Sequence, residues 1–271
     1  MKIGIQGTVG SFHYEVAKNL FGKKNEFVEC MDFNDIPALL KINQIDKGVM
    51  AIENTIAGAI LPNYSLIDEY DLHIAGEYYL PIHHHLMALP GQKTDDIREV
   101  WSHPMALLQC RKFFRKYPHI KLVEEKDTAE MAKIIQEKQL KGIGAIAGYE
   151  AAEIYGLNII AESIQTNKIN ATRFVVLDKK NGESVKDFNK ASIRFKLSHE
   201  PGSLLHILQI FKQYNLNMSK IQSVPIIDKP WEYAFFVDLL IDDIEKYQIA
   251  MYKVAQKVIE LKILGEYRRQ L

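Results

Sequence analysis

The chain is poor in cysteine, has no net charge and contains no long apolar run. Cys30 and Cys110 are the only cysteines among 271 residues and lack CxxC spacing, so we expect a reduced compartment and a cytoplasmic protein. Basic and acidic side chains number 34 each, so no global field favours nucleic acid or a membrane surface as a partner. No apolar run approaches the roughly 20 residues of a membrane helix, and the opening MKIGIQG is typical of a strand and turn, not of a signal peptide.

Short apolar strands alternate with helical patterns over the first 180 residues, which predicts an α/β fold with largely parallel sheets. A long extended segment, His73 to Leu89, could cross between two lobes. The expected strands are Ile3–Gln6, Phe27–Met31, Gly48–Ile52, His73–Tyr79, Val100–Ser102, Lys121–Glu125, Ile143–Ala147, Asn158–Glu162 and Arg173–Leu177. The expected helices are Ser11–Phe21, Phe33–Asn43, Leu61–Tyr70, Pro104–Tyr117, Thr128–Lys138 and Tyr149–Tyr155.

The last 80 or so residues show a different order. A polar stretch from Asp178 to Ser184 is typical of a linker. The elements beyond it follow the order β-α-β-β-α-β, which predicts a ferredoxin-like unit. They are strands at Ser192–Leu197, Met218–Pro225, Tyr233–Ile241 and Ile263–Tyr267, and helices around Leu204–Phe211 and Ile244–Leu261. We therefore expect one domain over residues 1–180 and a second over residues 190–271.

The run NATRFVVL places a hydroxyl, a guanidinium and a ring on the consecutive residues Thr172, Arg173 and Phe174. Neighbouring side chains of a strand point to opposite faces, so Thr172 and Phe174 share a face and Arg173 takes the other unless the strand bends. A hydroxyl donor beside a cation suits a small anionic substrate that must lose or gain an oxygen. The alternative is an ordinary strand start with a surface arginine.

Two further strand ends carry polar groups. Gly10 and Ser11 join the first strand to the first helix, where free N–H groups suit an anion and where Ser11 could equally be the helix cap. The pattern is neither GxGxxG nor a P-loop, so we expect no dinucleotide. Glu53, Asn54 and Thr55 end the third strand, and open α/β sheets bind ligands at such ends.

Histidines suggest two more sites. His103 ends another strand and could be a base, a carboxylate partner or a helix cap, and Gln109 lies on the helix that follows. His83, His84 and His85 are consecutive, but strand neighbours alternate faces and no HExxH spacing occurs, so we expect no metal.

Five segments, in order along the chain, resemble those of the prephenate dehydratase family. AIENTIAGAI is similar to its IEN(S/T)xxG segment, with Ala51 where proline is usual, and SHPMALLQC to its HPQxxxQC segment, with Met105 replacing the first glutamine and Gln109 keeping the second. NATRFVVL resembles its Thr-Arg-Phe signature. The other two segments are GTVGSFHYEVA, its opening glycine turn, and DTAEMA, a helix start.

The resemblance implies a catalytic region of two α/β lobes around a cleft, like a periplasmic binding protein, followed by an ACT domain that senses L-phenylalanine. It implies conversion of prephenate to phenylpyruvate without cofactor or metal, and a homodimer or homotetramer. The family's effector segments correspond to Gly202, Ser203, Leu204 and Leu205 and to a segment containing Gln222 and Ser223, where QSVP replaces ESRP. That change predicts weaker or altered phenylalanine binding.

The resemblance also implies roles for the polar side chains. Thr172 would assist the leaving hydroxyl, Arg173 would hold a carboxylate, and Glu53, Asn54 and Gln109 would complete the catalytic group. The implied substrate-binding residues are Gly10, Ser11, Thr55, His103 and Phe174. Two alternatives stay open: an arogenate dehydratase, and a non-catalytic binding protein that senses amino acids.

Overall fold

The computed structural model describes residues 1–179, 186–226 and 232–269. The chain forms two compact units, and each consists of segments that are not contiguous in sequence. The first comprises Met1–Gly58 and Tyr79–Phe174, and the second comprises Ala59–Tyr78 and Val175–Leu271. The expected linker residues 180–184, and with them the predicted boundary at residue 180, lie outside the described residues, so that boundary stays a prediction.

The first sheet has the strand order β2-β1-β3-β11-β5, with a two-residue strand, β4, paired to β3. Strand β1 pairs in parallel with both β2 and β3, as the alternation of strands and helices predicts. The elements are β1 (Lys2–Gln6), α1 (Phe12–Phe21), β2 (Glu26–Cys30), α2 (Asp35–Lys41), β3 (Lys47–Asn54), β4 (Gly58–Ala59), β5 (Leu72–Pro81) and β11 (Ala171–Lys179). The division between the two units passes through β5 and β11.

The second sheet has the order β10-β6-β9-β7-β8 and is mixed. Strand β7 is parallel to β8 and β9, but β6 is antiparallel to both β9 and β10, so the expectation of largely parallel sheets holds for only part of it. The elements are β6 (His85–Ala88), η1 (Thr94–Asp96), β7 (Glu99–Ser102), α4 (Pro104–Phe114), β8 (Lys121–Glu124), α5 (Thr128–Glu137), β9 (Ile143–Ala147), α6 (Tyr149–Tyr155) and β10 (Asn158–Ala161).

Strand β6 was not expected, because its apolar run lies inside the long extended segment. Its alternation is nevertheless clear: Leu86 packs in the apolar core with Leu107 of α4, whereas Met87 packs in the opposite core with Ala132 of α5. Consecutive residues of a strand face opposite sides of the sheet, so β6 is covered by helices on both sides.

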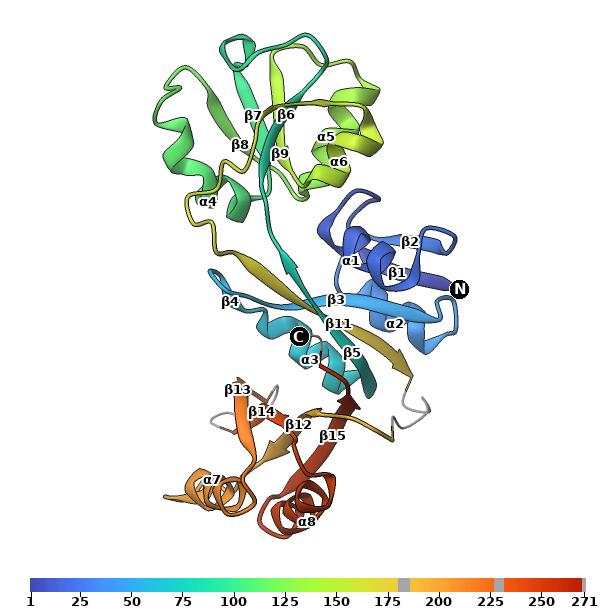
Figure 1. Cartoon of the computed structure of the whole chain (residues 1–271), viewed down its shortest axis with the longest axis vertical. Coiled ribbons are helices and arrows are strands. Elements are labelled where there is room, and N and C mark those ends of the chain that lie inside the picture. The colour runs from blue at the N-terminus through green and yellow to red at the C-terminus, as the bar shows by residue number, and fades with distance from the viewer. Residues whose placement is uncertain (180–185, 227–231, 270–271) are drawn as a thin grey trace. The chain divides into compact units, whose positions relative to one another are not determined.

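The C-terminal part of the second unit is the predicted βαββαβ fold, with an antiparallel sheet in the order β13-β14-β12-β15. Helices α7 and α8 cover one face of this sheet (Figure 1), where Phe195, Phe211 and Tyr247 form the centre of the core. The elements are β12 (Lys190–Lys196), α7 (Ser203–Gln213), β13 (Asn217–Pro225), β14 (Tyr233–Leu240), α8 (Ile244–Ala255) and β15 (Glu260–Tyr267).

Helix α3 (Leu61–Glu69) and the start of β5 cover the other face of this sheet. The residues Ala191, Ile193 and Phe195 of β12 enter the helical core, and the residues that alternate with them are polar and buried. Of these, Lys190 pairs with Glu77 of β5 at 2.7 Å, both side chains being 3% exposed or less. Arg194 pairs with Asp68 of α3 at 2.9 Å.

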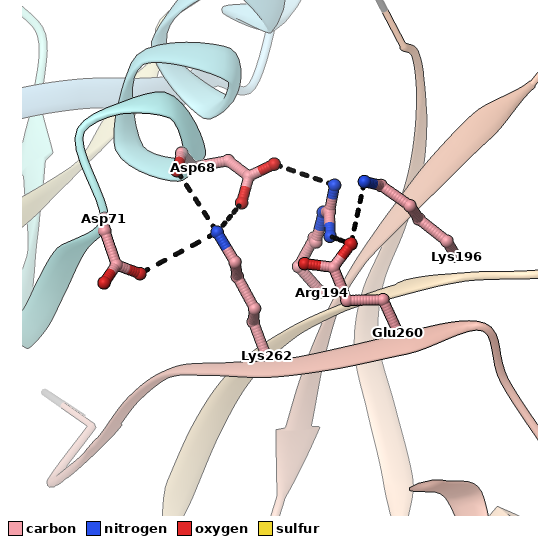
Figure 2. A network of polar contacts seen from close by, with 6 residues as sticks. All are labelled: Asp68, Asp71, Arg194, Lys196, Glu260 and Lys262. Atoms are coloured by element: carbon pink, nitrogen blue, oxygen red, sulfur yellow. Dashed lines mark hydrogen bonds and ion pairs between the residues drawn. The ribbon is translucent and has the colours of Figure 1, made fainter. Parts of the chain in front are cut away.

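Arg194 and Asp68 belong to a larger ionic network, which Figure 2 shows. Arg194 also pairs with Glu260 at 2.7 Å, and Lys196 reaches the same carboxylate oxygen at 2.7 Å. Lys262 pairs with the second oxygen of Asp68 at 2.8 Å and, at 3.7 Å, with Asp71. Three cations and three carboxylates therefore attach the α3 segment to strands β12 and β15.

Candidate functional site

The site centres on the point where β3 ends and β11 begins. Asn54 is the last residue of β3, and its side-chain nitrogen donates to the Thr172 hydroxyl at 2.9 Å and to Asn170 Oδ1 at 2.8 Å. Thr55 follows in the chain, and its backbone N–H and side-chain oxygen bind the backbone of Ala171 at 2.9 and 3.0 Å. Side chains more than a hundred residues apart in sequence thus meet at one sheet edge, as expected for an α/β site.

A chain of hydrogen bonds between neutral side chains continues from Asn54 to the lobe that contains the second sheet. Asn170 Nδ2 donates to Gln109 Oε1 at 2.9 Å, and His84 Nε2 lies 3.1 Å from the same oxygen. Asn170 and His84 are 3% and 5% exposed. Of the predicted catalytic residues, the structure thus brings Asn54, Gln109 and Thr172 into one connected group.

The arrangement leaves two donors available to a ligand. The Thr172 hydroxyl accepts from Asn54, and no described residue accepts its proton. The oxygen of the Gln109 side chain is used by Asn170 and His84, and its amide N–H groups have no partner among the described residues. Both are neutral donors, which suit an oxygen on which negative charge develops.

The Phe174 ring packs against His13 with ring centroids 4.9 Å apart, and both are buried. The backbone N–H of Ala51 donates to His13 Nε2 at 3.2 Å, which fixes that nitrogen as the unprotonated one. Burial lowers the pKa of His13 to about 3, so the imidazole is neutral near pH 7. Phe174 therefore packs against the neutral His13 ring next to the start of β11.

Arg173 follows Thr172 on β11 and lies near the ring of Tyr79. Strand β11 is continuous from Ala171 to Lys179, so alternation puts Arg173 on the face opposite Thr172. Its guanidinium carbon is 6.0 Å from the centre of the Tyr79 ring, and the side chain is buried.

The turn at Gly10 and Ser11, predicted to bind an anion, leads into helix α1, and Ser11 caps that helix. Ser11 Oγ donates to the backbone oxygen of Gln6 at 3.3 Å and accepts from the N–H of Tyr14 at 3.2 Å, so its hydroxyl is the N-cap of α1. Gly10 has φ of +93°, and a Cβ there would lie 3.2 Å from the Cα of Ala151, so glycine is required on two counts.

His103 is likewise a helix cap, because its Nδ1 accepts the N–H of Met105 at 3.2 Å at the start of α4. Asp127 caps α5 through Glu130 N–H at 2.8 Å, and burial raises the pKa of its carboxyl. Glu53, also predicted as catalytic, is half-buried at the end of β3 beside Asn54. The helix-capping hydrogen bonds thus occupy the Oγ atom of Ser11 and the Nδ1 atom of His103.

The three consecutive histidines separate. His83 hydrogen-bonds Gln165, His84 reaches Gln109, and His85 accepts from the backbone N–H of Ser163. Among the residues that the structure describes, no group of three or more histidine, cysteine or acidic side chains could hold a metal ion.

A separate pocket of about 360 Å³ lies in the βαββαβ part of the second unit, at the start of α7. Ser203 and Leu204 of the predicted effector segment line it, together with Pro201 and Phe235. Gly202 has φ of +85° and turns the chain into α7, whereas Leu205 is exposed. Gln222 and Ser223 lie on β13 and are not among the lining residues.

Sequence reasoning left Asn170 and His84 out of the site. Asn170 lies two residues before Thr172, and that proximity along the chain is a usable signal. His84 was considered only as a metal ligand, because no local pattern relates it to Gln109, which lies 25 residues further along the chain.

Two α/β lobes with a polar strand junction, in a chain that also carries a βαββαβ unit, define a periplasmic-binding-protein-like fold with a ferredoxin-like unit. The chain belongs to the prephenate dehydratase family, since the family model "PDT: Prephenate dehydratase" matches residues 3–182. It is a member with the two-lobed catalytic region and the ferredoxin-like ACT fold.

Relatives named prephenate dehydratase and relatives named arogenate dehydratase are both similar to almost the whole chain. A bifunctional chorismate mutase/prephenate dehydratase of Aquifex aeolicus is 34% identical over 273 residues, which cover all of this chain and 74% of that protein. Arogenate dehydratase 2 of Petunia hybrida is 34% identical over 286 residues, 98% of this chain and 71% of that protein.

A solved structure, prephenate dehydratase of Arthrobacter aurescens in complex with L-Phe, superposes with a TM-score of 0.88 at 24% identity. The match covers 99% of this chain and 90% of that one, and it establishes the shared fold. In the part of the chain that the structure describes, none of the helices has the length and apolar character to cross a membrane.

Proposed function

We propose that this protein converts prephenate to phenylpyruvate, carbon dioxide and water. The observation that carries the proposal is the Thr172 hydroxyl, which is held at 2.9 Å by Asn54 in a way that leaves its proton available. The bond from the ring to its carboxylate breaks and the electron pair enters the ring, while the 4-hydroxyl leaves with the pair of its C–O bond. The departing hydroxide takes up one proton and becomes water.

Thr172 is proposed to donate its hydrogen bond, or relay a proton, to the departing hydroxyl as charge develops there. The amide of Gln109, whose oxygen accepts from Asn170, is proposed to supply a second donor. Asn54 holds the Thr172 oxygen, and Glu53 is proposed to orient this part of the site. Aromatisation of the ring makes the reaction strongly downhill, so the residues need only stabilise the leaving group and orient the substrate.

Substrate contacts form the second part of the proposal. Arg173 is the proposed carboxylate ligand, in the forked geometry that a guanidinium offers. The turn at Gly10 and Ser11, together with Thr55, His103 and Phe174, is proposed to surround the remainder of the substrate. Neither cofactor nor metal takes part.

The decisive experiment offers purified full-length protein prephenate and arogenate separately. We expect phenylpyruvate from prephenate with the higher kcat/KM. A higher kcat/KM for arogenate, giving phenylalanine, would assign the alternative specificity that the Petunia relative carries in its name. Turnover of neither compound by folded protein would contradict the dehydratase proposal and favour a non-catalytic amino-acid sensor.

Feedback by L-phenylalanine is the regulatory part of the proposal. The pocket beside Ser203 and Leu204 supports it, because backbone groups of the Pro201–Ser203 turn can hold an amino acid's charged groups and Phe235 its ring. Gly202, Leu205, Gln222 and Ser223 belong to the same proposed site. Calorimetry should detect binding by full-length protein, with Leu204→Asp losing it and Ile249→Asp, an exposed position on α8, serving as control.

Association into a homodimer or homotetramer in the cytoplasm completes the proposal. Among the described residues, strands β13 and β15 are the two edges of the C-terminal sheet, and edge strands can pair with a second copy. Light scattering of the full-length protein tests it, and a monomer at every concentration used would contradict it.

A further inference from the structure

His84 is a buried polar residue to which the proposed chemistry gives no task. It is 5% exposed, follows strand β5, and packs edge-on against the ring of Phe12 at 5.7 Å. Its Nε2 contacts Gln109, and its Nδ1 is buried without a partner. A buried imidazole with one unused nitrogen carries a desolvation cost, so its retained contact with Gln109 requires an explanation.

The direction of the hydrogen-bond chain follows from its far end. Asn54 Oδ1 accepts the backbone N–H groups of Ile56 and Ala57, both at 2.9 Å. Backbone N–H groups can only donate, so the remaining atom that Asn54 presents to Asn170 and Thr172 must be its amide nitrogen.

The same logic fixes each later member. Asn170 receives the Asn54 donor on its oxygen and therefore presents its own nitrogen to Gln109. Gln109 must then present its oxygen, and an amide oxygen can only accept. The atom of His84 that faces this oxygen at 3.1 Å therefore carries a proton, which makes the ring the Nε2–H tautomer.

We propose that His84 is a positioning residue of the dehydratase site: its Nε2–H holds the Gln109 amide so that the Gln109 N–H groups and the Thr172 hydroxyl both remain directed to the substrate. The inference rests on the proposed function for what the two donors do. Without the His84 donor the Gln109 side chain can rotate, and it then offers its oxygen where a donor is required. The Asn170–Asn54 part of the chain loses its anchor at the same time.

His84 acts through Gln109 and not as an acid or base itself. Burial lowers the pKa of His84 to about 4, so the ring is neutral near pH 7. The neutral ring is also the form that the contact with the Phe12 ring and the unpartnered Nδ1 accommodate without a buried charge.

Three substitutions of His84 in full-length protein separate positioning from packing. His84→Phe keeps a ring against Phe12 and removes the donor, and we expect kcat to fall about tenfold to a hundredfold with little change in KM. His84→Gln places an amide N–H near the position of Nε2 and should restore most of the loss. His84→Asn places its amide near the position of Nδ1 and should not.

The matched control is His83→Phe at the neighbouring exposed position, which should retain the wild-type kcat. Thermal unfolding of each variant shows that it is folded. A folded His84→Phe with unchanged kcat overturns the proposal. So does an His84→Asn variant that is as active as His84→Gln, because a general polar requirement would then explain both.

The tautomer can be measured in the wild-type protein, so the test does not depend on any variant folding. Nitrogen-15 NMR of labelled histidine, with His84 assigned through its contact to Phe12, should show protonated Nε2 and unprotonated Nδ1 at pH 7. A protonated Nδ1 overturns the proposal whether or not the protein turns over prephenate. Absence of dehydratase activity with the expected tautomer instead contradicts the proposed function and leaves the hydrogen-bond chain intact.

Discussion

Buried polar side chains are linked differently in the candidate site of the first unit and on the polar face of the C-terminal sheet in the second unit. The site in the first unit is linked by neutral side chains: an imidazole, three amides and a hydroxyl, with contacts of 2.8 to 3.1 Å. The polar face of the C-terminal sheet in the second unit is linked by charges, including the Lys190–Glu77 pair and the six-residue network of Figure 2.

The difference reflects what each network does. A buried ion pair is costly to desolvate and contributes little net stability, but removing one partner leaves an uncompensated charge, so it specifies which segments pack together. A chain of neutral hydrogen bonds leaves no charge behind when it is broken. Each member fixes which atom of the next member donates and which accepts. We therefore expect damage to the ionic face to reduce folding stability, and damage to the neutral chain to reduce catalysis in folded protein.

The largest expected effect comes from Lys190→Met, which removes the ammonium that pairs with the buried Glu77 carboxylate. We expect the free energy of unfolding to drop by about 3 to 5 kcal/mol, measured by urea denaturation. The paired variant Lys190→Met with Glu77→Leu should recover most of that loss. Equal destabilisation by the single and the paired variants would show that the charge pair is not the source.

Thr172→Ala tests the other side of the comparison. Loss of a donor that strengthens in the transition state costs about a hundredfold to a thousandfold in kcat. We expect that loss with the unfolding free energy and substrate binding nearly unchanged, measured by steady-state kinetics and urea denaturation. Thr172→Ser, which keeps the hydroxyl, is the control, and near-normal turnover by folded Thr172→Ala would refute the assignment.

Arg173→Lys tests whether the Arg173 guanidinium, on the opposite strand face from Thr172, binds a carboxylate of the substrate. An ammonium keeps the charge but lacks the planar fork, so we expect KM to rise by about tenfold and kcat to change less. The measurement is again steady-state kinetics. If both constants are unchanged, Arg173 serves packing beside Tyr79 and the substrate's carboxylates are held by neutral donors alone.

Acid should weaken the two units at different pH. Burial lowers the pKa of His13 to about 3 and that of His84 to about 4, so each unfolded histidine binds more protons below about pH 6.5, and stability falls as pH drops from there. Lys196 and Arg194 lower the pKa of Glu260 to about 2, so its contribution is complete above about pH 4.3 and lost as pH falls toward 2.

Hydrogen exchange, resolved by peptide, should therefore show β9 of the first unit losing protection at a higher pH than β12 of the second. His13→Phe should flatten the first transition and Glu260→Gln the second. A single shared transition in the wild-type protein, unaffected by either substitution, would contradict this separation.

The smallest expected effect is that of a chelator, which should not change turnover. Because His83, His84 and His85 each contact a different partner, a chelator should leave turnover unchanged. Inactivation that added zinc reverses would refute this prediction and replace the neutral site with a metal site.

The sequence by itself determined the fold class, the βαββαβ order and the family. These rest on local periodicity and on motifs such as IENT and NATRF, in which neighbouring residues carry the signal. It also predicted that Asn54, Gln109 and Thr172 share one site, because each lies in such a motif, and hydrogen bonds link their side chains in the structure.

Only the tertiary structure decided which polar atoms meet. It brought His84 to Gln109 and Asn170 to Asn54, and it put α3 with the C-terminal sheet although α3 lies within the predicted catalytic region. The physical reason is that a hydrogen bond or an ion pair depends on where two atoms end up in space. Residues 25 or 116 positions apart leave no periodic signature of that encounter in the chain.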